Sequence, residues 1–108
     1  MTQPTQLRER VKSVAPTLVE LTDRVLLGEV WESAGLNKRD RSLVTIAVLI
    51  AMHRPEALAD HLILARANGV TDAEIEALTA HLAFYAGWPA AMTGARVTLE
   101  TLHPNERD

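Results

Sequence analysis

The most restrictive feature of this sequence is a long apolar run near its middle. The run covers residues 43–52, with Thr45 as its one polar residue. On a helical wheel its apolar side chains point in every direction, so a helix formed here must be covered on all sides. The run is shorter than the roughly 20 residues that span a bilayer, so it predicts a buried helix rather than a membrane helix.

Covering such a helix is difficult for a chain of this size. The chain has 108 residues, which predicts one domain over 1–108, with its core over about 18–102. So small a domain has few helices to place around a central one. We therefore expect copies of the chain to associate, and the alternative is a central helix that is wrapped by its own neighbours.

Composition excludes several classes of function. There is no cysteine, which rules out disulfides, thiolate metal sites and thiol redox chemistry in this chain. The formal net charge of -3 gives no general attraction for nucleic acid or for an anionic membrane. The first residues, Met1 to Glu9, are polar and show no apolar stretch of the kind found in signal peptides. We therefore expect a cytoplasmic protein.

Local signals divide the first half of the chain into helices. Pro16 stands just before Thr17-Leu-Val-Glu20, a sequence that fits a capping box, so a helix is predicted from there to Leu27 with Gly28 near its end. The segment 6–14 is a weaker helix candidate. Residues 29–39 are interpreted as a connection, and Asp40 is the expected N-cap of a helix over about 41–52.

The second half of the chain carries clearer boundaries. Pro55 fits the first turn of a helix that ends at Asn68-Gly69. Thr71-Asp-Ala-Glu74 is a second capping box and begins a helix to about Ala86. Gly87-Trp-Pro89 breaks that helix and begins the last one, to about Leu102, with a frayed tail over 103–108. No segment alternates like a strand, so the predicted fold class is all-α, a compact bundle of five to six helices.

Several segments, taken in order and spacing, resemble the carboxymuconolactone decarboxylase family. They cover roughly residues 18–102 and are Gly28-Glu29-Val30-Trp31, Gly35 to Leu43, Glu56 to His61, Ala67 to Thr71, Glu74-Ile75 and Tyr85 to Ala91. The resemblance implies an alkylhydroperoxidase D-like helical fold that assembles as a trimer or a ring-shaped hexamer. It also implies cofactor-independent removal of carbon dioxide from γ-carboxymuconolactone, in the β-ketoadipate pathway of aromatic catabolism.

A related branch of the superfamily reduces peroxides with Cys-x-x-Cys followed four residues later by His. This sequence has Arg54-Pro-Glu-Ala57 at the matching place and keeps the histidine as His61. No thiolate exists to attack a peroxide, so thiol peroxidase activity is not expected.

A cofactor-free decarboxylase needs a cation for the carboxylates of its substrate, a donor for the developing oxyanion and an acid to protonate carbon. His61, on the helical face of Ala57 and Leu64, is the first candidate for the acid or the donor. Arg41 and Arg39, at a helix start, are the candidates for holding a small anionic substrate. Each has a structural alternative: a histidine bonded to a backbone carbonyl, and arginines paired with Asp40 or with another subunit.

Three further residues complete the candidate site. Glu29 is a possible acid or base, or the partner of an arginine; Trp31 is a pocket wall or, more favoured, a core residue. His81, at the edge of an apolar stripe, is a second acid candidate with a structural role more favoured, whereas His53 is expected to be exposed. No His-x-x-x-His or Glu-x-x-His pair occurs, so a metal site is not expected. The unsaturated lactone that the resemblance implies as substrate is its own electron sink, so no other cofactor is expected either.

A second hypothesis has a different class of function. The chain could be a non-catalytic binding or assembly module that has kept the scaffold of the family, because a fold does not fix a reaction. A polar, cation-lined pocket around His61 and Arg41 would favour the enzyme. A filled cavity with those residues held in salt bridges would favour the module.

Overall fold

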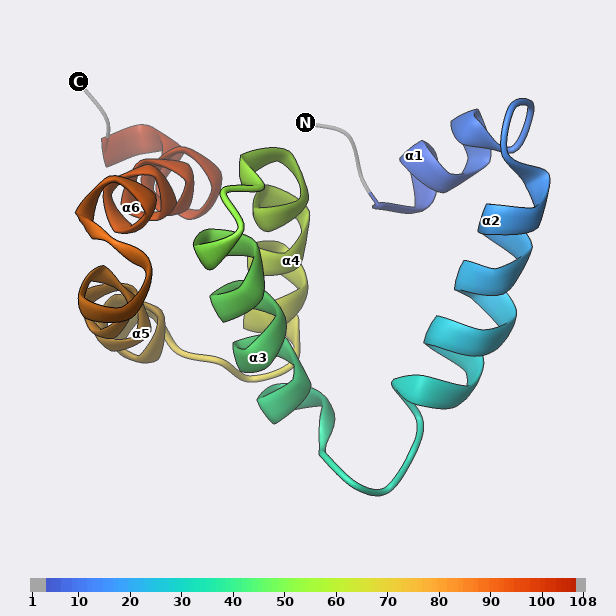
Figure 1. Cartoon of the computed structure of the whole chain (residues 1–108), viewed down its shortest axis with the longest axis horizontal. Helices are drawn as coiled ribbons and strands as arrows, with labels where there is room; N and C mark the ends of the chain where they lie inside the picture. Colours follow the sequence, from blue (N-terminus) through green and yellow to red (C-terminus); the bar gives the residue numbers. More distant parts are fainter. Residues whose placement is uncertain (1–3, 107–108) are drawn as a thin grey trace. The chain divides into compact units, whose positions relative to one another are not determined.

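A computed structural model describes residues 4–106 of the chain, with side chains from residue 8 onward. These residues are helical or in turns and include no strand, which confirms the all-α prediction. The chain divides into two compact units, residues 1–38 and 39–108. Each unit is described separately below, and Figure 1 shows the helices of both.

Unit 1 is built from short helices. Helix α1 covers Pro4–Val11, α2 covers Pro16–Leu21, and the π-helix η1 continues α2 over Thr22–Val30. An ion pair of 2.9 Å joins Arg8 Nε to Asp23 Oδ1, and Val19 is buried. The weak helix predicted over 6–14 is therefore real, although it begins earlier and ends at Val11.

Two boundary predictions in unit 1 are wrong. The capping box expected at Thr17 does not form: the N-cap is Ala15, and it has no side-chain cap bond. Pro16 occupies the first helical position, which suits a residue without an N–H and places Thr17 inside the helix. Gly28 does not end the helix either, because the wider π-type turns run on to Val30, and the Trp31 N–H donates to the Leu26 carbonyl at 2.9 Å.

Unit 2 contains four longer helices. They are α3 over Lys38–Ala51, α4 over Pro55–Ala67, α5 over Asp72–Ala86 and α6 over Trp88–Leu102. Helix α3 begins at Lys38 rather than after Asp40, so Asp40 lies in the first turn and is not the N-cap. The connection predicted over 29–39 is correspondingly shorter, over residues 31–37.

The boundaries predicted for the later helices are confirmed. Helix α4 begins at Pro55 and ends at Asn68, where Gly69 follows with a φ of 96°. The capping box at the start of α5 is complete: Thr71 Oγ1 accepts from the Glu74 N–H at 3.1 Å, and Glu74 Oε1 accepts from the Thr71 N–H at 2.9 Å. The end of the chain is more ordered than expected, because Pro104–Glu106 forms a 3-10 turn, η2.

The core of unit 2 joins all four of its long helices. Its most deeply buried members come from α3, α4 and α5: Ile46, Ile50, Leu58, Leu62 and Ile75. Helix α6 approaches α3 so closely that a Cβ added at Gly94 would lie 3.0 Å from Ile50 Cγ1. A glycine at this position therefore sets the separation between the two helices.

Helix α3 is covered on one side only. Ser42, Ile46 and Ile50 are buried, whereas Val44 and Val48 are 54% and 46% exposed. Helix α6 packs against both α4 and α5, and a hydrogen bond joins Ser42 of α3 to Asn68 at the end of α4. Within residues 4–106, no helix is both long enough and apolar enough to cross a membrane.

Candidate functional site

His61 lies on α4, at the edge of the face that packs into the core. Its neighbours one turn away on either side include Leu58 and Ala65, both fully buried. The Nδ1 atom is itself buried and has no hydrogen-bond partner within residues 8–106. A buried polar atom without a partner costs about 1–3 kcal/mol, so such an atom is a natural point of contact for a ligand.

Burial also sets the charge of His61. Removal from water disfavours the imidazolium and lowers the pKa of His61 below its ordinary value of 6.5, while the adjacent Asp60 acts in the opposite direction. The same burial raises the pKa of Asp60. His61 is therefore chiefly neutral at pH 7, with one ring nitrogen as a donor and the other as an acceptor.

A buried hydrogen bond shows which way this side of α4 faces. Asn68, seven residues after His61 on the same helical face, donates from Nδ2 to Ser42 Oγ of α3 at 3.0 Å. Ser42 is 2% exposed and is the one buried polar residue among those described. The end of this face, at Asn68, therefore contacts the start of α3.

Arg41 comes directly before Ser42, in the first turns of α3. It is half-buried, it has an interaction partner, and its carbonyl accepts from Thr45 Oγ1 at 2.8 Å. Along α4, seven residues separate His61 from Asn68, or roughly 10 Å at 1.5 Å per residue. The contact of Asn68 with Ser42 thus lies about two helical turns from His61 along α4, at the residue that follows Arg41.

Arg39 is held by two carboxylates. Its guanidinium pairs with Asp40 at 3.2 Å and with Glu74 of α5. The link to Glu74 joins the start of α3 to the start of α5. This arrangement matches the structural alternative for Arg39 more closely than a free anion-binding role.

The remaining candidates are spread over both units. His81 is exposed on α5, where its ring stacks on Tyr85 with centroids 4.7 Å apart. In unit 1, Glu29 is exposed near the end of η1, and Trp31 is half-buried directly after it. His53 is exposed, as expected, and has a φ of 59°.

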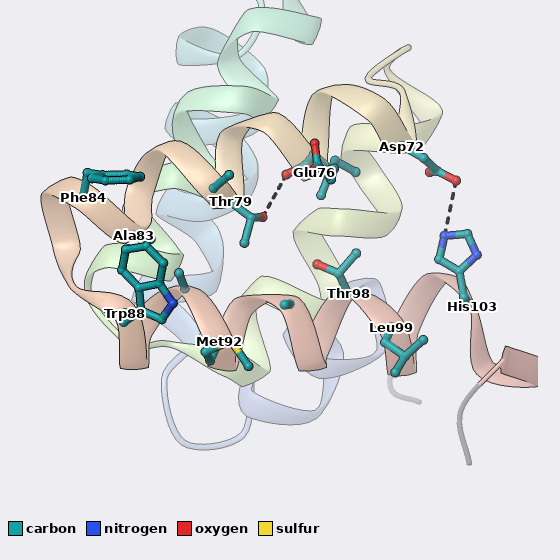
Figure 2. Close-up of a pocket in the computed structure, with 14 residues that line it drawn as sticks. Asp72, Glu76, Thr79, Ala83, Phe84, Trp88, Met92, Thr98, Leu99 and His103 are labelled. Carbon is teal, nitrogen blue, oxygen red and sulfur yellow. Dashed lines mark hydrogen bonds and ion pairs between the residues drawn. The ribbon is translucent and has the colours of Figure 1, made fainter.

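A groove between α5 and α6 is a feature that the sequence reasoning missed. It has a volume of about 560 Å³ and an almost wholly apolar lining (Figure 2). Phe84 and Trp88 stand at one end, and the ion pair of Asp72 Oδ2 with His103 Nε2, at 3.2 Å, closes the other. The sequence does hold the signal: Trp88, Met92, Ala95 and Leu99 recur at helical spacing beside a second apolar face of α6 that enters the core.

The grooves and the predicted site do not coincide. A second groove, in unit 1, is lined by residues from Lys12 to Arg24. Of the six predicted site residues, none lines either groove in the part of the chain that the structure describes. Within the same residues, no group of three His, Cys, Asp or Glu side chains could hold a metal ion.

Comparisons with known proteins identify relatives along most of the chain. The sequence profile of the carboxymuconolactone decarboxylase family matches residues 16–100. A 4-carboxymuconolactone decarboxylase from Acinetobacter baylyi is 48% identical over 68 residues, which are 63% of this chain and 51% of the relative. A nitrosuccinic acid decarboxylase from Metarhizium robertsii is 34% identical over 84 residues, which are 78% of this chain and 59% of the relative.

The matched segments thus span between half and three-fifths of these relatives' lengths. The profile match, in contrast, extends through both units, from the start of α2 almost to the end of α6. A match over so much of the sequence, with the helical fold expected from it, leads to one conclusion: this chain belongs to the carboxymuconolactone decarboxylase family.

Proposed function

We propose that this protein is a cofactor-independent decarboxylase of a small carboxylated substrate, and that it works in the cytoplasm as a homo-oligomer, a trimer or hexamer. The observation that carries the proposal is the buried Nδ1 of His61, which has no partner within residues 8–106. Two relatives named as decarboxylases support the reaction class.

The substrates in the relatives' names share one chemical property. Each carries an electron-withdrawing group, a lactone in one and a nitro group in the other. When the bond to the carboxylate breaks and carbon dioxide leaves, such a group takes up the electron pair that remains. The substrate is its own electron sink, so the protein has to bind, orient and donate a proton.

The described residues can divide these tasks. The Arg41 guanidinium holds a substrate carboxylate through paired hydrogen bonds at the start of α3. His61, neutral because it is buried, donates a hydrogen bond to the oxyanion that forms as carbon dioxide leaves. To protonate carbon it first takes up a proton from solvent, and the imidazolium returns to the neutral form when it gives that proton to carbon. The leucine and alanine side chains beside His61 keep water from the departing carboxylate, which lowers the barrier to its loss.

The other candidates take lesser places in this proposal. Arg39 is occupied by Asp40 and Glu74, and His81 by Tyr85, so both fit structural roles better. Glu29 and Trp31 remain a second acid and a wall of the substrate site.

The test is turnover by the purified chain without added metal. We expect loss of 4-carboxymuconolactone, or of nitrosuccinate, with release of carbon dioxide. His61→Gln should lower kcat about 10²–10⁴-fold, the usual contribution of a positioned acid or base. Arg41→Gln should raise KM. His53→Gln, the same change at an exposed histidine, is the matched control and should behave as the parent.

Two results would count against the proposal in different ways. Parent-like turnover by His61→Gln would remove His61 from the mechanism and leave the activity in place. A folded parent chain that consumes neither substrate would remove the decarboxylase assignment for this chain.

The alternative, a non-catalytic binding or assembly module, is favoured by two observations. Arg39 is held in ion pairs, and no predicted site residue lines either groove of the described chain. Calorimetric binding of a small dicarboxylate without turnover would select the module, and turnover would exclude it.

A further inference from the structure

The side chains that line the α5–α6 groove change in size along its length. Its floor is made of small buried or half-buried side chains such as Ala83 and Ala91, and large side chains rise at the end near Gly87. Figure 2 shows Phe84 and Trp88 standing at this end, with their rings edge to face at 5.3 Å. Toward the middle, the lining consists of Thr79, Ala80 and Ala95. One surface therefore carries both projections and hollows.

The walls of the groove are too exposed for a small-molecule pocket. Phe84 is 78% exposed, Met92 62% and Trp88 57%. Ligand sites typically bury 70–90% of a small ligand. A ligand lying between these walls would keep one side in water, so an extended surface, rather than a small molecule, fits this groove.

We propose that the α5–α6 face is a self-association surface, on which the same face of a second copy of this chain packs about a two-fold axis. Two α5–α6 hairpins would then form a four-helix bundle. The two helices suit this arrangement because they are antiparallel and each is 15 residues long. The proposal names a surface that would join two trimers in the proposed hexamer, since a trimer alone has no two-fold axis, and it does not depend on the proposed decarboxylation.

A two-fold axis explains the gradation of side-chain size. In a face-to-face pair with opposite directions, the Phe84–Trp88 end of one copy lies over the middle of the groove of the other. The bulky rings then enter the hollow lined by Thr79, Ala80 and Ala95, as in knobs-into-holes packing. Met92, midway between the ring end and this hollow, lies near the axis, where each copy meets its own equivalent.

The exposed apolar area is large enough to form the centre of such a contact. Phe84 and Trp88 each have about 150–250 Å² to bury, and more than half of that is still exposed here. Together with Met92, these side chains offer roughly 400 Å² per copy. A standard interface buries about 800 Å² per partner, so these side chains supply about half of that area.

The charges at the groove also permit a copy to approach. Asp72 is paired with Arg66 at 2.8 Å and with His103, and Glu100 beside the groove is paired with Arg96 at 2.9 Å. Among the described residues, Glu76 is the one ionised lining side chain without an ion pair. A two-fold contact opposes like charges, so a nearly neutral face is what self-association needs.

The experiment measures mass in solution. We expect the parent chain to be associated at about 100 µM, where a micromolar Kd leaves most copies bound. Ala95→Glu should reduce the mass to half of the parent value, because it puts a charged side chain into the hollow that the rings of the other copy fill. Ala95 is exposed, so the same change should leave the helical circular dichroism intact. Met92→Lys is a second, independent disruption of the same face.

Ala67→Glu provides the control, because Ala67 is exposed on α4 outside the groove. It should keep the parent's mass. A monomeric parent, or Ala95→Glu and Met92→Lys chains that keep the parent's mass, would overturn the proposal. The assay measures mass alone. The self-association proposal therefore stands even if the chain proves not to be a decarboxylase, and a monomeric chain would not remove the decarboxylase assignment.

Discussion

Gly94 is the position where a single methyl group most directly tests the packing of unit 2. A Cβ built there would lie 3.0 Å from Ile50 Cγ1, 3.1 Å from Cδ1 and 3.4 Å from Cγ2. Carbon atoms in contact prefer about 3.5–4.0 Å, so two of these contacts are too short by roughly half an ångström. Ile50 is 2% exposed and packed on all sides, so it has little room to move away.

Two effects of Gly94→Ala oppose each other. Alanine in a helix interior is favoured over glycine by about 1 kcal/mol. Overpacking a core by a methylene costs about 1–3 kcal/mol, and the short contacts to Ile50 place this site near the middle of that range. We expect a net loss of about 1 kcal/mol, or roughly 4–8 °C in Tm for a domain of this size.

Urea unfolding followed by circular dichroism measures this loss, and a double-mutant cycle assigns it. Ile50→Val removes Cδ1, one of the three crowded atoms, so Gly94→Ala should cost less in the Ile50→Val background. If Gly94→Ala is as stable as the parent or more so, then Ile50 moves aside freely and the reasoning fails.

Two further predictions concern the capping of α5 and the charge of His61. Thr71→Ala should cost about 1 kcal/mol of unfolding free energy in urea, because the Glu74 N–H loses its acceptor. Thr17→Ala, where the expected cap is not formed, should change stability by less than about 0.5 kcal/mol; equal losses would contradict the assignment. Burial lowers the pKa of His61 in the folded chain, so the unfolded chain binds that proton more tightly. The free energy of unfolding should therefore fall as the pH drops through 6.5 toward the lower pKa of folded His61. Urea unfolding between about pH 7.5 and pH 5.5 should show this fall, and His61→Gln should flatten it where His53→Gln does not; a slope unchanged in His61→Gln would show that His61 is not its source.

The errors in the predicted boundaries share one physical cause. At Pro16 and at Asp40, two neighbouring residues can each begin a helix. The packing of the folded chain, rather than the local sequence, selects one of them. Asp40 remains a favourable acidic residue in the first turn of α3, even though the helix begins at Lys38. Glycine is unfavourable inside a helix, but the helix nevertheless continues through Gly28 to Val30.

What the sequence determined by itself is local. Pro55, Asn68-Gly69, the Thr71 capping box and Gly87 set the limits of α4, α5 and α6, because their effects act within one turn of the backbone. The all-helical class and the family follow from the same kind of pattern. The absence of cysteine excludes thiol chemistry whatever the fold.

What only the tertiary structure decided depends on residues far apart in the chain. Arg39 is occupied because Glu74 of α5 reaches it, and the end of α4 meets the start of α3 because Asn68 binds Ser42. The groove exists because the second apolar face of α6 finds no helix to cover it among the described residues. Each of these outcomes depends on whether two helices contact each other in space. Neither helix propensity nor residue spacing along the chain encodes which helices meet.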